Sequence, residues 1–234
     1  MPCASVTGPL RFEAAGELGM SAKAYFTVAL IALPLMGCAV GRDEIKLASA
    51  PMSPKTQMAN KGRNVFIRSV TDARVFEKDS KDPSTPSLGE GGTPDIRARA
   101  VSRKRNGYGM ALGDVTLAPG QTVTGKVSEA LEQAFKQSGY TVVAAAGAAN
   151  PIIVDVRVKK FWTWTKPGFT AITLVSDIDA ELTITGAKSA PAAITTHLED
   201  AMLAAGSDAR VNSLQKAPSA FRTEAVAKLA DLKS

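Results

Sequence analysis

The chain contains one histidine, and any Ser/His/Asp or Cys/His catalytic arrangement would have to use it. This residue, His197, lies on the presumed polar face of a strand, with no nucleophile motif nearby. Asp177, Asp179 and Glu181 also share one strand face, a spacing that could pair carboxylates or hold a cation. Such a row is more often the solvated side of a sheet, and no calcium-loop spacing is present. We therefore expect no enzymatic activity, no cofactor and no metal site.

Cys38 is the residue with the clearest predicted chemistry. It follows a lysine, an apolar stretch over residues 24–36 and the small residue Gly37, which is the layout of a secretory signal peptide. Leu35–Cys38 resembles the lipobox of bacterial lipoproteins. The resemblance implies cleavage between Gly37 and Cys38, a diacylglyceryl group on the cysteine sulfur, and N-acylation. As a helix, about 13 apolar residues would rise only about 20 Å, too short to favour a membrane span.

The signal-like motif also suggests how the chain is divided. Glu13 and Glu17 do not suit a signal peptide, so Met20 is the better start and residues 1–19 are interpreted as a start-site extension. The expected segments are a signal peptide at 20–37, a lipidated tether with an edge strand at 38–63, and one domain at 64–234. Ala39 stands where an aspartate would favour inner-membrane retention, so the lipoprotein resemblance implies an outer-membrane anchor facing the periplasm.

A basic run gives the chain its most distinctive charge pattern, within a formal net charge of +6. By composition it resembles a nucleic-acid patch, but export makes nucleic acid an improbable ligand. Two alternatives stay open: contact with anionic lipid head groups, or a solvated loop partly neutralised by the acidic stretch before it. The candidate interaction surface consists of Arg97, Arg99, Arg103, Lys104, Arg105 and Tyr108.

The strongest periodicity lies in the second half of the chain. Apolar residues occupy alternate positions over 152–164 and 172–184, on either side of a turn at Pro167-Gly168. This alternation predicts an antiparallel hairpin with one dry face. A weaker third strand is expected over 191–199.

Two tryptophans lie near the end of the first hairpin strand. Trp162 and Trp164 could form a ligand platform or a partner contact near the hairpin tip. However, they continue the alternation of Val156 and Val158. We therefore expect them to pack on the same face as those valines, against one of the two predicted helices.

The remaining elements are shorter or helical. Apolar spacing predicts an edge strand over Asp43–Leu47, a strand over Asn64–Val70 and another over 140–143. A period near 3.6 predicts helices over Gln121–Ser138 and Pro218–Leu232.

These elements define an expected fold class. The stretch between Asp72 and Gly120 is rich in Pro, Ser, Gly and charge, which predicts a long polar surface loop. The element order is then strand, strand, helix, four-strand meander, helix. This order predicts an α+β fold with a mostly antiparallel sheet and the helices packed on one face.

Short motifs follow one another in a characteristic order from Cys38 onward. After the cysteine come the edge strand Asp43–Leu47 and a strand that ends in Asp72-Ala73-Arg74. A helix, Gly139-Tyr140 and a long strand through Phe161-Trp162 follow. This order resembles that of the YajG-like lipoproteins of Gram-negative bacteria. The resemblance implies a lipid anchor at Cys38 and carries over no catalytic residue.

Two function classes follow from these expectations. The first is a non-enzymatic envelope lipoprotein, held in the membrane by acyl chains on Cys38, whose domain binds an envelope protein or polymer. The second is an accessory lipoprotein of a lipid, lipopolysaccharide or ABC-type transport system. A solid core with an exposed hairpin or loop surface would favour the first class. An apolar cavity lined by the meander would favour the second.

Overall fold

The computed structural model describes most of the chain from Gly41 onward. The predicted extension 1–19, the signal peptide 20–37 and Cys38 lie outside the described residues. No helix within the described part is both long and apolar enough to cross a membrane. The described residues are 41–49, 62–78, 80–89, 92–106, 108–145, 147, 150–168, 171–187, 193–202, 207–229 and 232.

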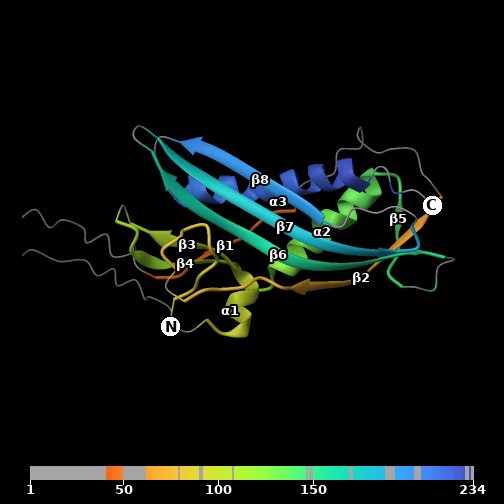
Figure 1. Cartoon of the computed structure of the whole chain (residues 1–234), viewed down its shortest axis with the longest axis horizontal. Coiled ribbons are helices and arrows are strands. Elements are labelled where there is room, and N and C mark those ends of the chain that lie inside the picture. Colours follow the sequence, from red (N-terminus) through yellow and green to blue (C-terminus); the bar gives the residue numbers. More distant parts are fainter. Residues whose placement is uncertain are drawn as a thin grey trace, which may run out of the picture. The chain divides into compact units, whose positions relative to one another are not determined.

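Three long antiparallel strands dominate the fold (Figure 1). They are β6 (Ile152–Pro167), β7 (Ile172–Thr185) and β8 (Ala193–Met202), and β7 pairs with both of the others. They confirm the predicted hairpin and its third strand. On its other edge, β6 pairs in parallel with β2 (Asn64–Asp72) along its first half.

Shorter strands complete a mixed eight-stranded sheet. β3 (Ala100–Arg105) contacts the second half of β6 and pairs with β4 (Ala111–Leu117), which holds the edge strand β1 (Asp43–Ile45) in parallel. β5 (Thr141–Val142) pairs in parallel with β2 and not with β6, so the meander has three strands and not the predicted four. The predicted α+β class with a mostly antiparallel sheet is confirmed.

Two helices, α2 (Val123–Gln137) and α3 (Ser207–Leu229), cover one face of the long strands (Figure 1). The Thr122 side chain accepts from the Gly125 amide 3.0 Å away and caps the start of α2. At its end Gly139 has a φ of 83°, and the Tyr140 amide donates to the Phe135 carbonyl over 3.0 Å. This αL cap was expected for a glycine that follows a helical pattern.

The last helix begins well before its predicted start at Pro218. Proline lacks a backbone N–H, so it is tolerated in the first turn of a helix and disfavoured in the interior. Its presence therefore suggested a helix start at Pro218, where the structure has the interior of the helix. Leu214 and Ala217 before it and Phe221 after it are all buried in one core. Packing of this continuous apolar stripe against the sheet outweighs the local cost of Pro218.

The predicted loop between Asp72 and Gly120 is wrong in part, because it contains the helix α1 (Pro94–Arg99) and the strands β3 and β4. These elements are six or seven residues long, so each contains too few apolar repeats to stand out among its charged neighbours. Val101, Val115 and Leu117 are fully buried and anchor this hairpin in the core.

The tryptophans are buried as predicted, but on the opposite face. A β-bulge lies between Val158 and Lys160, where one extra residue of β6 has no partner on β7. Beyond it the alternation changes phase, so Phe161 faces the helices and Trp162 faces away from them. The expectation that Trp162 and Trp164 share a face with Val156 and Val158 is therefore wrong.

Residues 76–78 and 80–89, here called the covering segment, lie over these tryptophans. The ring of Phe76 contacts Trp162 edge-on, with centroids 6.2 Å apart. The Trp162 indole donates to the Pro83 carbonyl over 3.0 Å. Leu88 joins the two indoles in a second, smaller apolar cluster. The sheet therefore has a helix-covered face and, near the end of β6, a face covered by this segment.

Arg74 occupies the junction between β2 and β3 along one edge of β6. Its guanidinium forms a two-point ion pair with Asp72, at 2.8 and 2.7 Å. It also donates to the carbonyls of Arg97, Ala100 and Phe161. β2 reaches only Val158 of β6, and β3 pairs with β6 at Thr163. Arg74 thus satisfies polar backbone in the interval between two strand pairings.

Candidate functional site

The turn between β3 and β4 presents two large apolar side chains to solvent. Tyr108 is 94% exposed and Met110 is 62% exposed. The turn itself is ordered by Asn106, whose side-chain oxygen accepts from the amides of Tyr108 and Met110 over 3.0 and 2.9 Å. Gly109 adopts a φ of 83°, which suits glycine at this point of a tight turn. The hairpin tip therefore holds a defined projecting surface.

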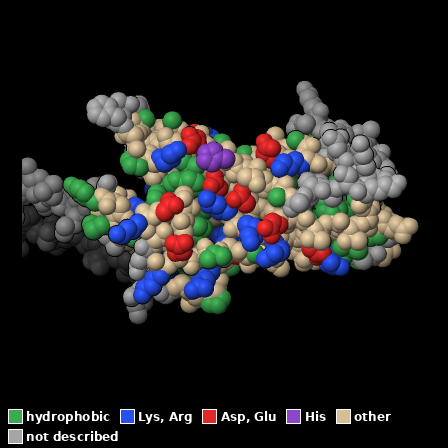
Figure 2. Space-filling view, in the orientation of Figure 1, with side chains coloured by type: hydrophobic (Ala, Val, Ile, Leu, Met, Phe, Trp, Pro, Cys, Tyr) green, Lys and Arg blue, Asp and Glu red, His purple; other side chains and the backbone are tan. Residues whose placement is uncertain are grey.

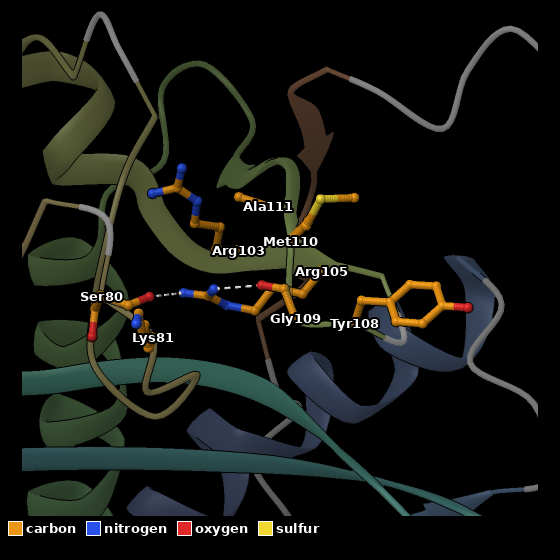
Figure 3. A pocket seen from close by; sticks show the side chains of 8 residues that line it. All are labelled: Ser80, Lys81, Arg103, Arg105, Tyr108, Gly109, Met110 and Ala111. Carbon is orange, nitrogen blue, oxygen red and sulfur yellow. Dashed lines mark hydrogen bonds between the residues drawn. The ribbon is translucent and has the colours of Figure 1, made fainter.

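A hollow of about 410 Å³ lies beside this tip (Figure 3). Lys81 comes from the covering segment, Arg103 and Arg105 come from β3, and Tyr108 and Met110 come from the turn. Figure 3 shows Arg105 reaching across toward Ser80, with Lys81 on the same side and Tyr108 on the other. Two parts of the chain far apart in sequence thus bring three basic side chains to one place.

Arg105 fastens the two walls of the hollow together. Its guanidinium donates to the Gly109 carbonyl over 2.9 Å and to the Ser80 carbonyl over 2.6 Å. Burial lowers the pKa of Arg105 below its ordinary value, and the nearby charge of Arg103 lowers it further. The two guanidinium groups therefore lie close enough to repel each other.

Arg103 also lines the hollow, and its guanidinium is turned away from those of Arg105 and Lys81 (Figure 3). Its side chain is only 10% exposed, and its Nε is 4.0 Å from a carboxylate oxygen of Asp114. Asp114 is itself buried and accepts from the Gly89 amide over 3.2 Å. Within the described residues, Nε and Nη1 of Arg103 are buried and have no hydrogen-bond partner.

The other residues of the predicted basic surface are used to hold the fold together. The buried Arg99 pairs with Glu44 at 2.9 Å and with Asp95 at 3.0 Å, and Lys104 pairs with Asp43 at 2.9 Å. Arg97 donates to the Gly92 carbonyl. The structure therefore brings only Arg103, Arg105 and Tyr108 of the predicted six residues together at the hollow.

His197 belongs to a charged network on the face of the sheet turned away from α2 and α3. Its side chain is 56% exposed, and its Nδ1 lies 2.7 Å from Asp177. Asp177 also accepts from Lys160 over 2.7 Å, and Glu199 accepts from Lys166 over 2.8 Å. Figure 2 shows acidic and basic side chains interspersed over this face. These ion pairs agree with the expected solvated side of a sheet.

The carboxylate row contains one perturbed group. Burial, and then the charge of Asp177, raise the pKa of Asp179 above its ordinary value. Within the described residues, no group of three or more His, Cys, Asp or Glu side chains is arranged to hold a metal ion.

Lys81 and Met110 are site residues that the sequence pattern did not single out. Lys81 lies among alternating acids and bases, which suggest only a solvated loop. Its place in the hollow depends on the covering segment packing onto the tryptophans. Asn106-Gly107, a dipeptide that favours hairpin turns, was the local signal that could have placed Tyr108 and Met110 at an exposed tip.

Comparisons with known proteins provide neighbours of low similarity. No family model and no curated protein matches the sequence. One structural neighbour is a crystal structure of a Xanthomonas campestris protein of the family DUF330, with 13% identity and a TM-score of 0.44, covering 81% of this chain and 95% of that one. Another is a crystal structure of an uncharacterized protein, with 13% identity and a TM-score of 0.37, covering 82% of this chain and 97% of that one.

Proposed function

We propose that this chain is a lipid-anchored, non-enzymatic envelope lipoprotein of the YajG-like kind, located at the periplasmic face of the outer membrane. In this proposal Cys38 carries the acyl chains, and the α+β domain binds another envelope component, a protein or a polymer. The observation that carries the binding role is the tip of the β3–β4 hairpin. There Tyr108 and Met110 project into solvent beside a basic hollow.

Exposed aromatic and methionine side chains on an ordered turn are typical of interaction surfaces. Tyrosine and methionine are enriched at protein interfaces because they offer large contact areas, and arginine adds directional hydrogen bonds. The tip combines all three residue types within one short hairpin. The remaining exposed large apolar side chain in the described part, Val75, lies elsewhere, at the start of the connection after β2.

The packing of the meander supports the binding role over the transport role. On the helix side, apolar residues of β6, β7 and β8 form one cluster with residues of α2 and α3, including Val154, Ile178, Ile194 and Phe221. On the other side, Trp162 and its neighbours pack under the covering segment. A packed sheet with an exposed hairpin is the arrangement expected for a partner-binding domain.

The anchor is tested by Cys38→Ser in the native host. The variant should lose its acyl chains and leave the membrane fraction after a high-salt wash, because each buried methylene adds about 0.8 kcal/mol of membrane affinity. Ala39→Asp is the matched control for sorting: it keeps the anchor and should move the protein toward the inner-membrane fraction. Retention of Cys38→Ser in washed membranes would contradict the anchor.

The binding surface is tested by site-specific photo-crosslinking in intact envelopes. A photoreactive amino acid replaces Tyr108 in one strain and Val75, which is 75% exposed, in the control strain. The expected result is a discrete crosslinked product at position 108 that is absent at position 75, with its partner identified by mass spectrometry. Equal products at both positions, or none at position 108, would refute the hairpin tip as the binding surface.

A further inference from the structure

The hollow beside the hairpin tip has the chemistry of an anion site. We infer that it binds a phosphate group, carried either by a lipid headgroup or by a soluble ligand, through Lys81, Arg103 and Arg105. This inference deepens the proposed function, because it names the chemical group that the proposed binding surface recognises. It rests on the proposed function only in that both use the same surface.

Arg103 provides the first support, since its charge is incompletely compensated. Nε and Nη1 are buried and lack hydrogen-bond acceptors within the described part of the chain. The Asp114 oxygen 4.0 Å from Nε is beyond hydrogen-bond distance. Leaving charged donors buried and unpaired is costly. Arg103 lines the hollow, so an anion there would compensate its positive charge across a short distance without contacting the two buried nitrogens.

Arg105 and Lys81 provide the second support. Arg105 directs two donors at the carbonyls of Ser80 and Gly109, which fix its position without neutralising its charge. Burial and then repulsion from Arg103 lower its pKa, and the charge of Asp82 acts in the opposite direction. Lys81 is exposed on the same wall and adds a third positive charge. A bound anion would relieve this repulsion.

The number and type of cations favour phosphate over a carboxylate. The charged side chains that line the hollow are all basic. Asp82 and Asp114 lie near it but are not part of its lining. Phosphate offers several acceptor oxygens and up to two negative charges, and planar guanidinium groups match its geometry. A volume of about 410 Å³ also leaves room for the group that carries the phosphate.

Fluorine NMR on the full chain in zwitterionic micelles can test this site directly. The chain has three tyrosines, and Tyr108 is 94% exposed at the rim of the hollow whereas Tyr140 is only 3% exposed. The protein is labelled with 3-fluorotyrosine, and Tyr108→Phe assigns the reporter resonance. Inorganic phosphate is titrated at constant ionic strength against chloride. A saturable shift of the Tyr108 resonance is the expected result.

Charge reversal on the covering segment separates a site from a general field. Lys81→Glu should weaken phosphate binding about tenfold, because it replaces a contacting cation with an anion. Lys78→Glu makes the same change at an exposed position outside the hollow and should alter binding by no more than about twofold. No saturable shift, or an equal loss in both variants, would overturn the phosphate site.

A second titration identifies the source of the phosphate. Dihexanoylphosphatidylglycerol, mixed into the zwitterionic micelles, carries the phosphate on a lipid. A shift of the same resonance at lower concentration than inorganic phosphate assigns the site to a headgroup, and the reverse order assigns it to a soluble ligand. Phosphate binding without a crosslink at Tyr108 would refute the proposed partner binding alone, whereas a crosslink without phosphate binding would refute this inference alone.

Discussion

Replacing Arg74 with methionine should be among the most destabilising single substitutions in this domain. The side chain is fully buried, forms the two-point ion pair with Asp72 and donates to three backbone carbonyls. Arg74→Met removes all of these hydrogen bonds, while the methionine keeps much of the apolar volume. The acceptors would then be left without their donor between β2, β3 and β6.

The expected loss follows from two opposing contributions. Hydrogen bonds to a charged group contribute about 1.5–3 kcal/mol each, but the guanidinium also had to be desolvated when the chain folded. Asp72 is 25% exposed and can be solvated without its partner, whereas the three backbone carbonyls lose their donor. An unpaired buried acceptor costs about 1–3 kcal/mol, so we expect a total loss of about 3–5 kcal/mol, a large fraction of the 5–15 kcal/mol typical of a domain. Urea unfolding followed by tryptophan fluorescence measures it, because Trp162 contacts Phe76, whose ring lies 5.0 Å from the Arg74 guanidinium.

Arg68, in the preceding strand β2, provides a matched control. Its Nε and Nη2 donate to the two carboxylate oxygens of Asp155, but its side chain is 57% exposed. Arg68→Met should hardly move the urea midpoint, since solvent screens an exposed pair. Arg74→Lys should recover only part of the loss, because an ammonium cannot reproduce the two-point pair. A midpoint for Arg74→Met no lower than that for Arg68→Met would refute the reasoning.

Three further substitutions test other parts of the fold. Trp162→Ala should cost about 3–5 kcal/mol in urea unfolding and should expose the covering segment, not the helices, to limited proteolysis. Asp177 raises the pKa of His197 above 6.5. Protonated histidine therefore stabilises the fold below about pH 6.5, and the urea midpoints of the parent and His197→Gln should converge as pH rises through that raised pKa. Gly113→Ala places a Cβ against the Gly41 carbonyl and should cost about 1–3 kcal/mol, with faster proteolysis near β1.

Long periodic segments were predictable from the sequence because each carries its own signal. The alternation over 152–164 and 172–184 predicted β6 and β7, and the helical spacing with Gly139 predicted α2 and its C-terminal cap. In these elements many apolar residues repeat at one spacing, so a single residue that departs from the spacing does not hide the pattern.

Short elements and phase changes were not predictable in the same way. β3 and β4 are six and seven residues long, so Val101, Val115 and Leu117 provide too few repeats to distinguish a strand from a loop. The bulge between Val158 and Lys160 adds one residue, and period-2 alternation cannot show where such an addition occurs.

The missed bulge in β6 and the missed site residue Lys81 have a common physical origin. The bulge turns Trp162 to the face without helices, where an uncovered indole would be exposed to water. The covering segment buries that indole through Phe76, Pro83 and Leu88. Packing there places Lys81 at the hollow opposite the hairpin. A polar stretch that suggested only a loop therefore forms one wall of the candidate site, because the phase of a neighbouring strand requires it to fold back.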